Sequence, residues 1–547
     1  MTGWSHHLII APILIPVAAA AILLFIEERR RVAKALTSLA STLLLLVVAL
    51  ILFRIESGPN GFEGVYLLGN WAAPFGIVLV LDGLSALMLF LTAIVAVAAL
   101  VYSTARWHAM GAHFHSMFQL LLMGVNGAFL TGDLFNLFVF FEVMLAASYG
   151  LLLHGSGPQR VKAGLHYIAV NLAAALLFLI GVSLIYGTAG TLNMADLAAR
   201  IPEIEPDRRM LMEAGAGVLG VAFLIKAGMW PLCFWLPTAY SAASAPVAGI
   251  FAILSKLGIY VILRLTMLLF AEGPSAGFGS SVLLYGGMAT LIFAIIGVLA
   301  SQALGRLAGY SVLVSSGTLL MVLGINDGAV SAGALLYLVS STLTISAFFM
   351  LIELVERSQD AGANVLAVTM EAYGDADEDG PIEGDGVTMP GTLAILGTCF
   401  AMCAILLSGL PPLSGFIAKF AMLSAMMGTG AIGVPPTAAV WTLIFLVILS
   451  GVASLISMTR AGIRTFWTSI EGTVPRVLVI EIVPVMCLLA LTLVLTVQAS
   501  AALDYVDTTI RTLSNPSIYI DAVRNATVVP GVDGGPGSPG NPSGGGY

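Results

Sequence analysis

The chain is dominated by apolar segments, each about as long as a helix that crosses a bilayer. A transmembrane helix requires roughly 20 consecutive apolar residues, and fourteen segments meet this requirement, several of them with an interruption. They span residues 5–26, 35–53, 79–102, 112–131, 134–153, 163–187, 211–235, 246–270, 280–300, 306–325, 330–355, 391–428, 436–458 and 477–500. Only 10% of the 547 residues are charged, and the mean hydropathy is +1.00. The sequence therefore predicts an all-α, multi-pass membrane protein.

Charge in the loops predicts the orientation. The first segment has no basic residue before it and no clear small-residue cleavage site, so we expect a retained helix rather than a signal peptide. A basic run follows it at residues 29–34, which the positive-inside rule assigns to the cytoplasm. This assignment places three arginines, at positions 200, 208 and 209, in an outer loop, where neighbouring carboxylates partly offset their positive charge. With fourteen crossings, both termini are predicted on the outer side.

Two stretches are not membrane helices by composition. Residues 356–389 are acidic and predict a mobile cytoplasmic loop, which is either a simple solvated insertion or a funnel that collects cations. The C-terminal tail becomes rich in glycine, proline and serine from about residue 531 and is expected to be disordered.

The composition shows no pattern for a bound metal or cofactor. All four cysteines (Cys233, Cys399, Cys403 and Cys487) lie in apolar segments, where a thiol usually acts as a small core residue. No haem, iron–sulfur or zinc spacing is present. The net charge of −8 comes largely from one loop and indicates no nucleic-acid partner. We therefore expect no cofactor and no metal site.

Two apolar segments are interrupted by proline. One reads "FLIKAGMWPLCFWLP" over residues 223–237, with Lys226 before the break, and the other reads "LLSGLPPLSGFIAKFAML" over 406–423, with Lys419 after it. Backbone groups freed at such a break survive in a membrane only when they are packed in protein or line a wet cavity. Paired interruptions of this kind point to a transport site.

Charged residues also lie deep in unbroken segments. Glu142 and Lys256 are near the middle of theirs, where a charge costs at least ~2.5 kcal/mol on insertion scales. A functional role is the better interpretation for both, with structural ion pairing as the alternative. Arg264 is expected to reach the interface from its helix end, and Asp133 is expected to cap a helix.

Two further carboxylates, Glu353 and Glu481, lie near predicted cytoplasmic ends and are expected at the interface, with an entry or exit role as the alternative. Lys162 and His166 are candidates for a cytoplasmic proton mouth.

The chemistry of these deep groups suits proton transfer. Burial lowers the pKa of a lysine and raises that of a glutamate, whereas a nearby opposite charge does the reverse. A buried Glu–Lys pair is therefore able to titrate near neutral pH as a coupled unit. A row of such groups is a proton relay.

Four motifs carry a resemblance to a known family. The stretches "FFEVMLAASYGLL", "FLIKAGMWPLCFWLPTAY", "LSKLGIYVILR" and "SGLPPLSGFIAKF" resemble helices of the antiporter-like subunits of respiratory complex I and of Mrp-type (Pha-type) cation/proton antiporters. The resemblance covers roughly residues 70–500. Within the superfamily, "LTGDLFNLFVFFEVM", the lysine in "SGFIAKF" and "NPSIYIDAVRNA" are most similar to the D subunit of the Mrp type.

The resemblance implies a fold. It implies about fourteen transmembrane helices, in which helices 4–8 and 9–13 are two inverted five-helix repeats and helices 7 and 12 are broken. The corresponding regions are an N-terminal part at 1–111, the repeats at 112–270 and 271–458, helix 14 at 459–502 and the tail at 503–547.

The resemblance also implies roles for individual residues. Glu142 would pair with Lys226, Lys256 would bridge the two halves, and Lys419 would end the proton relay. Relatives often have a histidine in helix 11, where this chain has Ser340 and Ser341. The central connection is therefore expected to depend on hydroxyl groups and water.

The implied function is that of a proton-translocating subunit of a multi-subunit Na⁺/H⁺ antiporter in the bacterial inner membrane. It is a secondary transporter subunit rather than an enzyme, with other membrane subunits as partners. Its ions are H⁺ and Na⁺, with Li⁺ or K⁺ as alternatives to Na⁺. Two rivals remain: a proton-pumping subunit of a redox complex, either NADH-quinone oxidoreductase or a membrane-bound hydrogenase, and a membrane scaffold with structural ion pairs.

Overall fold

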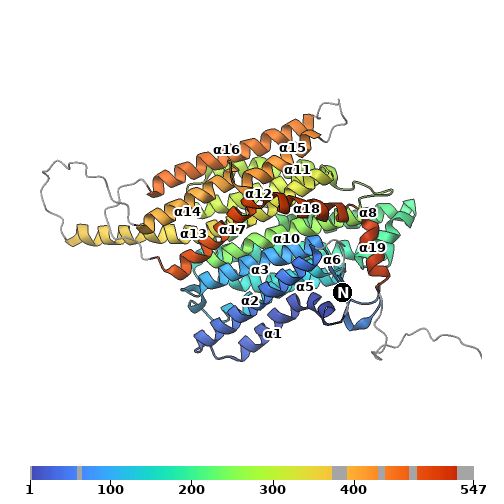
Figure 1. Ribbon diagram of the computed structural model, residues 1–547, viewed down its shortest axis with the longest axis horizontal. Helices are drawn as coiled ribbons and strands as arrows, with labels where there is room; N and C mark the ends of the chain where they lie inside the picture. Colours follow the sequence, from blue (N-terminus) through green and yellow to red (C-terminus); the bar gives the residue numbers. More distant parts are fainter. Residues whose placement is uncertain (1–2, 58–63, 373–390, 429–437, 467–476, 527–547) are drawn as a thin grey trace, which may run out of the picture.

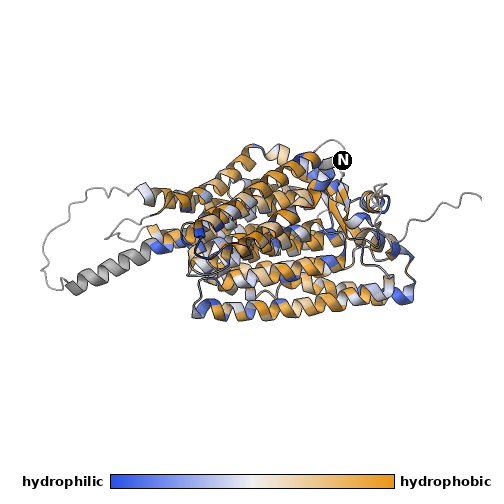
Figure 2. Cartoon of the chain, turned by 90° about the horizontal axis from the view of Figure 1, so that it is seen from below, coloured by the Kyte–Doolittle hydropathy of each residue, from blue (hydrophilic) through white to orange (hydrophobic). Residues whose placement is uncertain are grey.

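Long helices lie side by side along most of the molecule (Figure 1). The computed structural model describes residues 3–57, 64–372, 391–428, 438–466 and 477–526. In a bilayer every backbone polar group must be hydrogen-bonded within the protein, and the helix satisfies this requirement within one segment. Figure 2 shows apolar residues along the helices and hydrophilic residues gathered toward the two ends of the bundle.

The apolar helices are Ala11–Phe25 (α1), Arg31–Glu56 (α2), Gly83–Ser103 (α3), Phe114–Leu130 (α4), Leu134–Leu153 (α5), Pro158–Ala189 (α6), Pro206–Ala227 (α8), Trp235–Ala242 (α9), Ala245–Leu269 (α10), Ser280–Ala300 (α11), Leu304–Leu323 (α12), Gly328–Ala372 (α13), Gly391–Ser408 (α14), Ser414–Gly428 (α15), Ala438–Phe466 (α16) and Val479–Val497 (α17). Among the described residues, twelve of these helices are long and apolar enough to cross a membrane alone. The shorter α1 and α4 bring the number to fourteen, with α9 and α15 as the second halves of broken helices. The predicted all-helical membrane architecture is confirmed.

Two groups of five helices follow the same plan. The first is α4, α5, α6, the broken α8/α9 and α10, and the second is α11, α12, α13, the broken α14/α15 and α16. In each group the first helix packs on the second, and the third packs on the broken one. The first group lies within the predicted region 112–270, whereas α16 extends beyond the end of the predicted region 271–458, to Phe466. Both breaks thus occupy the fourth position of a group.

Helices α10 and α13 form the interior of the bundle. The apolar stretch of α10 is buried throughout and that of α13 almost throughout. In contrast, α2, α6 and α16 expose large apolar side chains, as expected for helices that face lipid or a partner subunit. Lys256 on α10 is therefore remote from the surface of the chain.

The end of the bundle that holds both termini has a cover that the sequence does not predict (Figure 1). Strands Gly64–Leu67 (β1) and Val78–Leu81 (β2) pair antiparallel, with Val65 opposite Val80. Further short elements lie in the loops of this end: Gly3–Ile9 (η1), Leu68–Asn70 (η2), Met194–Arg200 (α7) and Ile201–Glu203 (η4). The remaining short element, Trp107–Ala109 (η3), lies at the opposite end. Helices Ala499–Leu513 (α18) and Pro516–Arg524 (α19) pack across α13 and α7.

At the opposite end, α13 runs as a helix to Ala372, into the range that the sequence predicts as a loop. An acidic loop therefore begins later than residue 356. The rest of the predicted loop, up to residue 389, lies outside the described residues, as does the tail from residue 527.

Candidate proton-relay site

The first helix break is built by Gly228. This residue has a φ of +78°, a conformation that favours glycine, and the amide of Met229 closes the end of α8 by donating to the carbonyl of Leu224. Pro231, which has no amide hydrogen to continue the helix, follows before α9 begins. Lys226 lies in the last turn of α8, directly before the break.

Lys226 and Glu142 lie near each other at this break, with no hydrogen bond between them. Glu142 is half-buried on α5, and its charge interacts with that of Lys226. The Lys226 ammonium is 5.5 Å from the ring centroid of Phe141, a cation–π contact. Within the described part of the chain its Nζ is buried without a hydrogen-bond partner. The structure thus brings together two residues that are far apart in the sequence.

Three packed aromatic rings lie beside Lys226. Phe141, Phe178 and Phe223 come from α5, α6 and α8, with ring centroids 5.2 to 6.2 Å apart. They exclude water from one side of the ammonium, and this lowers the local dielectric and strengthens its interaction with Glu142.

Asp133 accepts a hydrogen bond from the Asn136 amide at 2.9 Å, which confirms the predicted helix cap.

Lys256 lies at the centre of the molecule. It is fully buried on α10, and its Nζ donates to Ser315 Oγ on α12 at 2.7 Å. The Ser315 hydroxyl is in turn 2.9 Å from Ser341 Oγ on α13. A lysine and two hydroxyls from three helices therefore form a continuous hydrogen-bonded chain.

Lys419 lies over the second break. Gly409 follows α14 with a φ of +74°, and Lys419 Nζ on α15 donates to the carbonyl of Ser408 at 3.1 Å. A Cβ at position 409 would be 2.7 Å from Lys419 Cδ. The ammonium therefore binds a carbonyl that the helix end leaves without an intrahelical partner.

Hydroxyl groups line the space between the two central lysines. Ser340 Oγ on α13 is 2.9 Å from Ser414 Oγ at the start of α15. A cavity with space on the order of one water molecule lies here. Its polar lining comes from Ser311, Ser315, Tyr337, Ser340, Ser341 and Ser454. Ser341 thus contacts Ser315 and Ser340 contacts Ser414, and their role in a relay stays a prediction.

The accessory candidates lie elsewhere. Lys162 and His166 are exposed on the first turns of α6, where His166 Nδ1 bonds the Lys162 carbonyl at 2.9 Å. Their role at a proton mouth stays a prediction.

Glu353 belongs to a cluster at the end of the bundle opposite the termini. It accepts from Trp107 Nε1 at 2.8 Å and lies 3.6 Å from Arg357, which also binds Glu481 at 2.8 Å. Glu481 lies in the first turn of α17, and its side chain is only 1% exposed. Its position at the membrane interface stays a prediction. The arginine compensates its charge, so that burial becomes possible.

The expectation that Arg264 reaches the membrane interface from its helix end is wrong. Its guanidinium is buried and pairs with Asp82, with 2.8 Å between Nη2 and Oδ1. It also donates to Tyr260 at 3.0 Å and lies over the ring of Tyr519. Helix α19 supplies Tyr519 and covers the Arg264 guanidinium, so that this group does not reach the surface. No sequence signal for this partner is visible, since Asp82 reads as an ordinary helix cap.

Comparison with known proteins identifies the family. The model of the transmembrane domain of the NADH:quinone oxidoreductase and Mrp antiporter family matches residues 131–457. A probable K(+)/H(+) antiporter D subunit of Rhizobium meliloti (strain 1021) is 63% identical over 96% of this chain and 99% of its own length. A Na(+)/H(+) antiporter D subunit of Alkalihalophilus pseudofirmus is 35% identical over 86% of this chain and 90% of its own.

Solved structures agree on the fold. A chain of the Mrp complex from Dietzia sp. DQ12-45-1b superposes with a TM-score of 0.81 at 24% identity, over 96% of this chain and 100% of that one. The fourteen spans, the two broken helices and the buried lysines thus occur in a chain with close relatives among antiporter subunits. The chain belongs to the NADH:quinone oxidoreductase/Mrp antiporter transmembrane family.

Proposed function

We propose that this chain is the proton-translocating subunit of a multi-subunit antiporter that exchanges H⁺ for a monovalent cation. The observation that supports it most directly is the buried chain from Lys256 through Ser315 to Ser341. The relatives named as D subunits of K⁺/H⁺ and Na⁺/H⁺ antiporters support cation exchange as the coupled process. We place the protein in a bacterial inner membrane, with both termini on the outer side.

The relay begins at Glu142 and Lys226. A proton that binds the Glu142 carboxylate removes the negative charge that stabilises the Lys226 ammonium. The ammonium then releases a proton toward the centre. The loss of positive charge at Lys226 in turn keeps Glu142 protonated until Lys226 takes up a proton again, so the two groups titrate as a coupled pair.

The central step uses hydroxyl groups. A protonated Lys256 donates to Ser315 Oγ, and a hydroxyl is able to accept one proton while it gives up another. Ser341, a water molecule in the adjoining cavity, and Ser340 with Ser414 continue the path toward Lys419. The proton count is conserved, because each group that gains a proton on one side releases one on the other.

We place the path of the exchanged cation in a partner subunit. A dehydrated Na⁺ needs several oxygen ligands in close reach. Among the described residues, no group of three or more histidine, cysteine, aspartate or glutamate side chains is arranged to hold a metal ion. The cation, whether Na⁺, K⁺ or Li⁺, would then be coupled to proton flow through the assembly.

Flux measurements on variants test the proposal. In everted vesicles, Glu142→Ala, Lys226→Ala and Lys419→Ala are each expected to abolish cation-dependent proton exchange while the complex still assembles. Arg208→Ala is the matched control, because Arg208 lies on the same helix as Lys226 but is exposed. Wild-type exchange in any of the three variants removes that residue from the relay.

Two other outcomes would favour the rivals. Iron–sulfur or flavin absorbance in the purified native complex would support a redox-driven pump over an antiporter. Loss of assembly in Lys226→Ala, with normal flux in whatever complex remains, would support a structural ion pair.

A further inference from the structure

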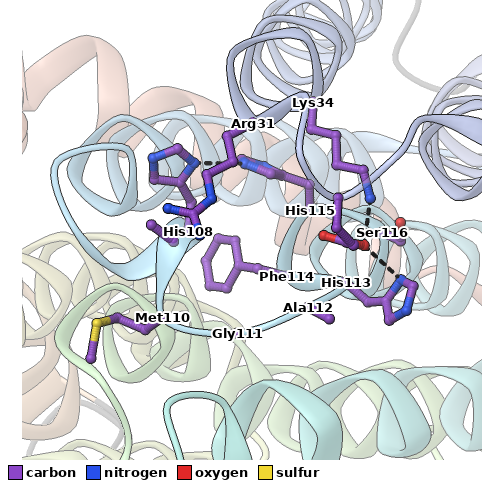
Figure 3. A pocket seen from close by; sticks show the side chains of 12 residues that line it. Arg31, Lys34, His108, Met110, Gly111, Ala112, His113, Phe114, His115 and Ser116 are labelled. Atoms are coloured by element: carbon purple, nitrogen blue, oxygen red, sulfur yellow. Dashed lines mark hydrogen bonds and ion pairs between the residues drawn. The ribbon is translucent and has the colours of Figure 1, made fainter.

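A cavity of about 270 Å³ lies at the end of the bundle opposite the termini, away from the relay. It is formed where the loop between α1 and α2 meets the first turn of α4 (Figure 3). Its polar lining consists of Glu28, Arg31, Lys34, His108, His113, His115 and Ser116. Figure 3 shows Arg31 and Lys34 reaching from α2 toward the α4 turn.

The first turn of α4 lacks a side-chain cap. Its N-cap is His113, which has a φ of +61° and makes no capping hydrogen bond. Amide hydrogens in the first turn of a helix have no intrahelical partner, and with the helix dipole they favour a negative charge. Arg31 and Lys34 add positive charge on the facing side of the same cavity.

Two buried polar atoms in the cavity wall have no partner among the described residues. They are His115 Nδ1 and Ser116 Oγ, on side chains that are 4% and 2% exposed. His115 Nε2 contacts His108 Nδ1 at 3.4 Å, and in the tautomer in which Nε2 accepts this bond, Nδ1 carries a hydrogen that is free to donate. Buried polar groups are normally hydrogen-bonded, and these two point to a missing acceptor.

One oxyanion already occupies part of this environment. The Glu28 carboxylate accepts from Lys34 Nζ at 2.6 Å and lies 3.2 Å from His113 Nδ1. The bond to Lys34 holds the pKa of Glu28 below its ordinary value in spite of partial burial. Since the partners of Glu28 among the described residues are Lys34 and His113, Arg31, His115 and Ser116 are left for a second acceptor.

We propose that this cavity binds a phosphate group, held by Arg31, His115 Nδ1, Ser116 Oγ and the first-turn amides of α4. A phosphate offers several acceptor oxygens, and arginine recognises it in bidentate fashion. The phosphate comes either from an anionic lipid headgroup or from free inorganic phosphate. Binding would fasten the α1–α2 loop to α4, and the proposal does not depend on the relay.

Binding is expected to strengthen as the pH falls. Burial and the nearby Arg31 lower the pKa of His108. A bound anion opposes the effect of Arg31 and favours the charged imidazole, so proton uptake and anion binding assist each other. The other charged or titratable groups in the cavity are Glu28, Arg31, Lys34, His113 and His115.

Calorimetric titration of the full chain in its purified native complex tests the proposal. We expect saturable binding of inorganic phosphate and of sulfate, with sulfate affinity higher at pH 6 than at pH 8, where sulfate itself does not titrate. Arg31→Gln and Ser116→Ala should each weaken binding, by about tenfold or more for the arginine. Arg29→Gln is the control, because Arg29 is exposed on the same loop and does not line the cavity.

Reconstitution in nanodiscs distinguishes the two sources. A lipid source predicts that phosphatidic acid raises the unfolding temperature and displaces free phosphate, relative to discs of phosphatidylcholine alone. A free-ion source predicts equal phosphate binding in both discs. Absence of saturable anion binding in detergent and in both discs, or equal affinity in Arg31→Gln and the wild type, would overturn the proposal.

Discussion

The ammonium of Lys256 has one described hydrogen-bond partner, and that partner is a hydroxyl. A buried charge without a counter-ion is costly, and fixed dipoles must replace the water that it has lost. Ser315 provides such a dipole and at the same time connects the lysine to Ser341. In the proposed relay, one hydroxyl therefore both stabilises the charge and passes the proton to Ser341.

Alanine variants of Ser315 and of its neighbour Ser316 distinguish the hydroxyl on the proposed path from a buried hydroxyl beside it. Ser315→Ala is expected to lower the rate of cation-coupled proton exchange about tenfold or more, since a hydrogen bond to a charged group contributes about 1.5–3 kcal/mol. Ser316→Ala is the control, because Ser316 is equally buried on α12 but its hydroxyl has no described partner. The rates of cation-coupled proton exchange of the two variants are measured in proteoliposomes. Equal rates in the two variants would exclude Ser315 from the path.

At the scale of elements, the two broken helices have related construction. Each first half ends at a glycine in the left-handed region, Gly228 after α8 and Gly409 after α14. The lysines differ in placement, since Lys226 precedes its break and Lys419 follows it. In both cases an ammonium lies beside a helix end, where the carbonyls of the last turn lack intrahelical partners.

The second break is open to a direct test. Gly409→Ala forces a β-carbon into a φ of +74° and against the Lys419 side chain. Such strain costs about 1–3 kcal/mol, and we expect both a lower unfolding temperature and loss of exchange because the ammonium is displaced. Gly391→Ala at the start of α14 is the control, since a Cβ there would meet no atom within 4 Å. Normal exchange in Gly409→Ala would show that the position of Lys419 over the break is not needed.

Across the whole molecule, the sequence predicts the spans and breaks well and the contacts less well. Apolar length and proline position are local properties, so the fourteen spans and the sites near Lys226 and Lys419 could be predicted. The Asp82–Arg264 pair joins residues on α3 and α10 under a cover made by α19, and this depends on chain segments distant in sequence. The same holds for the link from Lys256 to Ser315, because helix packing alone decides which hydroxyl faces the lysine.

The Asp82–Arg264 pair makes a prediction about stability at this scale. Asp82→Asn leaves a buried guanidinium without a counter-charge, and this is expected to cost about 3–5 kcal/mol of unfolding free energy. Asp507→Asn breaks an exposed pair with Arg511 and should cost at most about 1 kcal/mol. Thermal unfolding in detergent compares the two. Equal unfolding temperatures would mean that the buried pair contributes little to the bundle.

The serine-lined centre has a kinetic consequence. Unlike a carboxylate or an imidazole, a serine hydroxyl does not retain an extra proton near neutral pH. No group between Lys256 and Lys419 on the proposed path is therefore stably protonated. Each passage also leaves every hydroxyl on the path pointing the opposite way from how it began. The next proton can follow only after these groups have rotated back. In the proposed relay, the middle of the molecule therefore transmits single protons in discrete cycles, and the time needed for this rotation sets an upper limit on turnover.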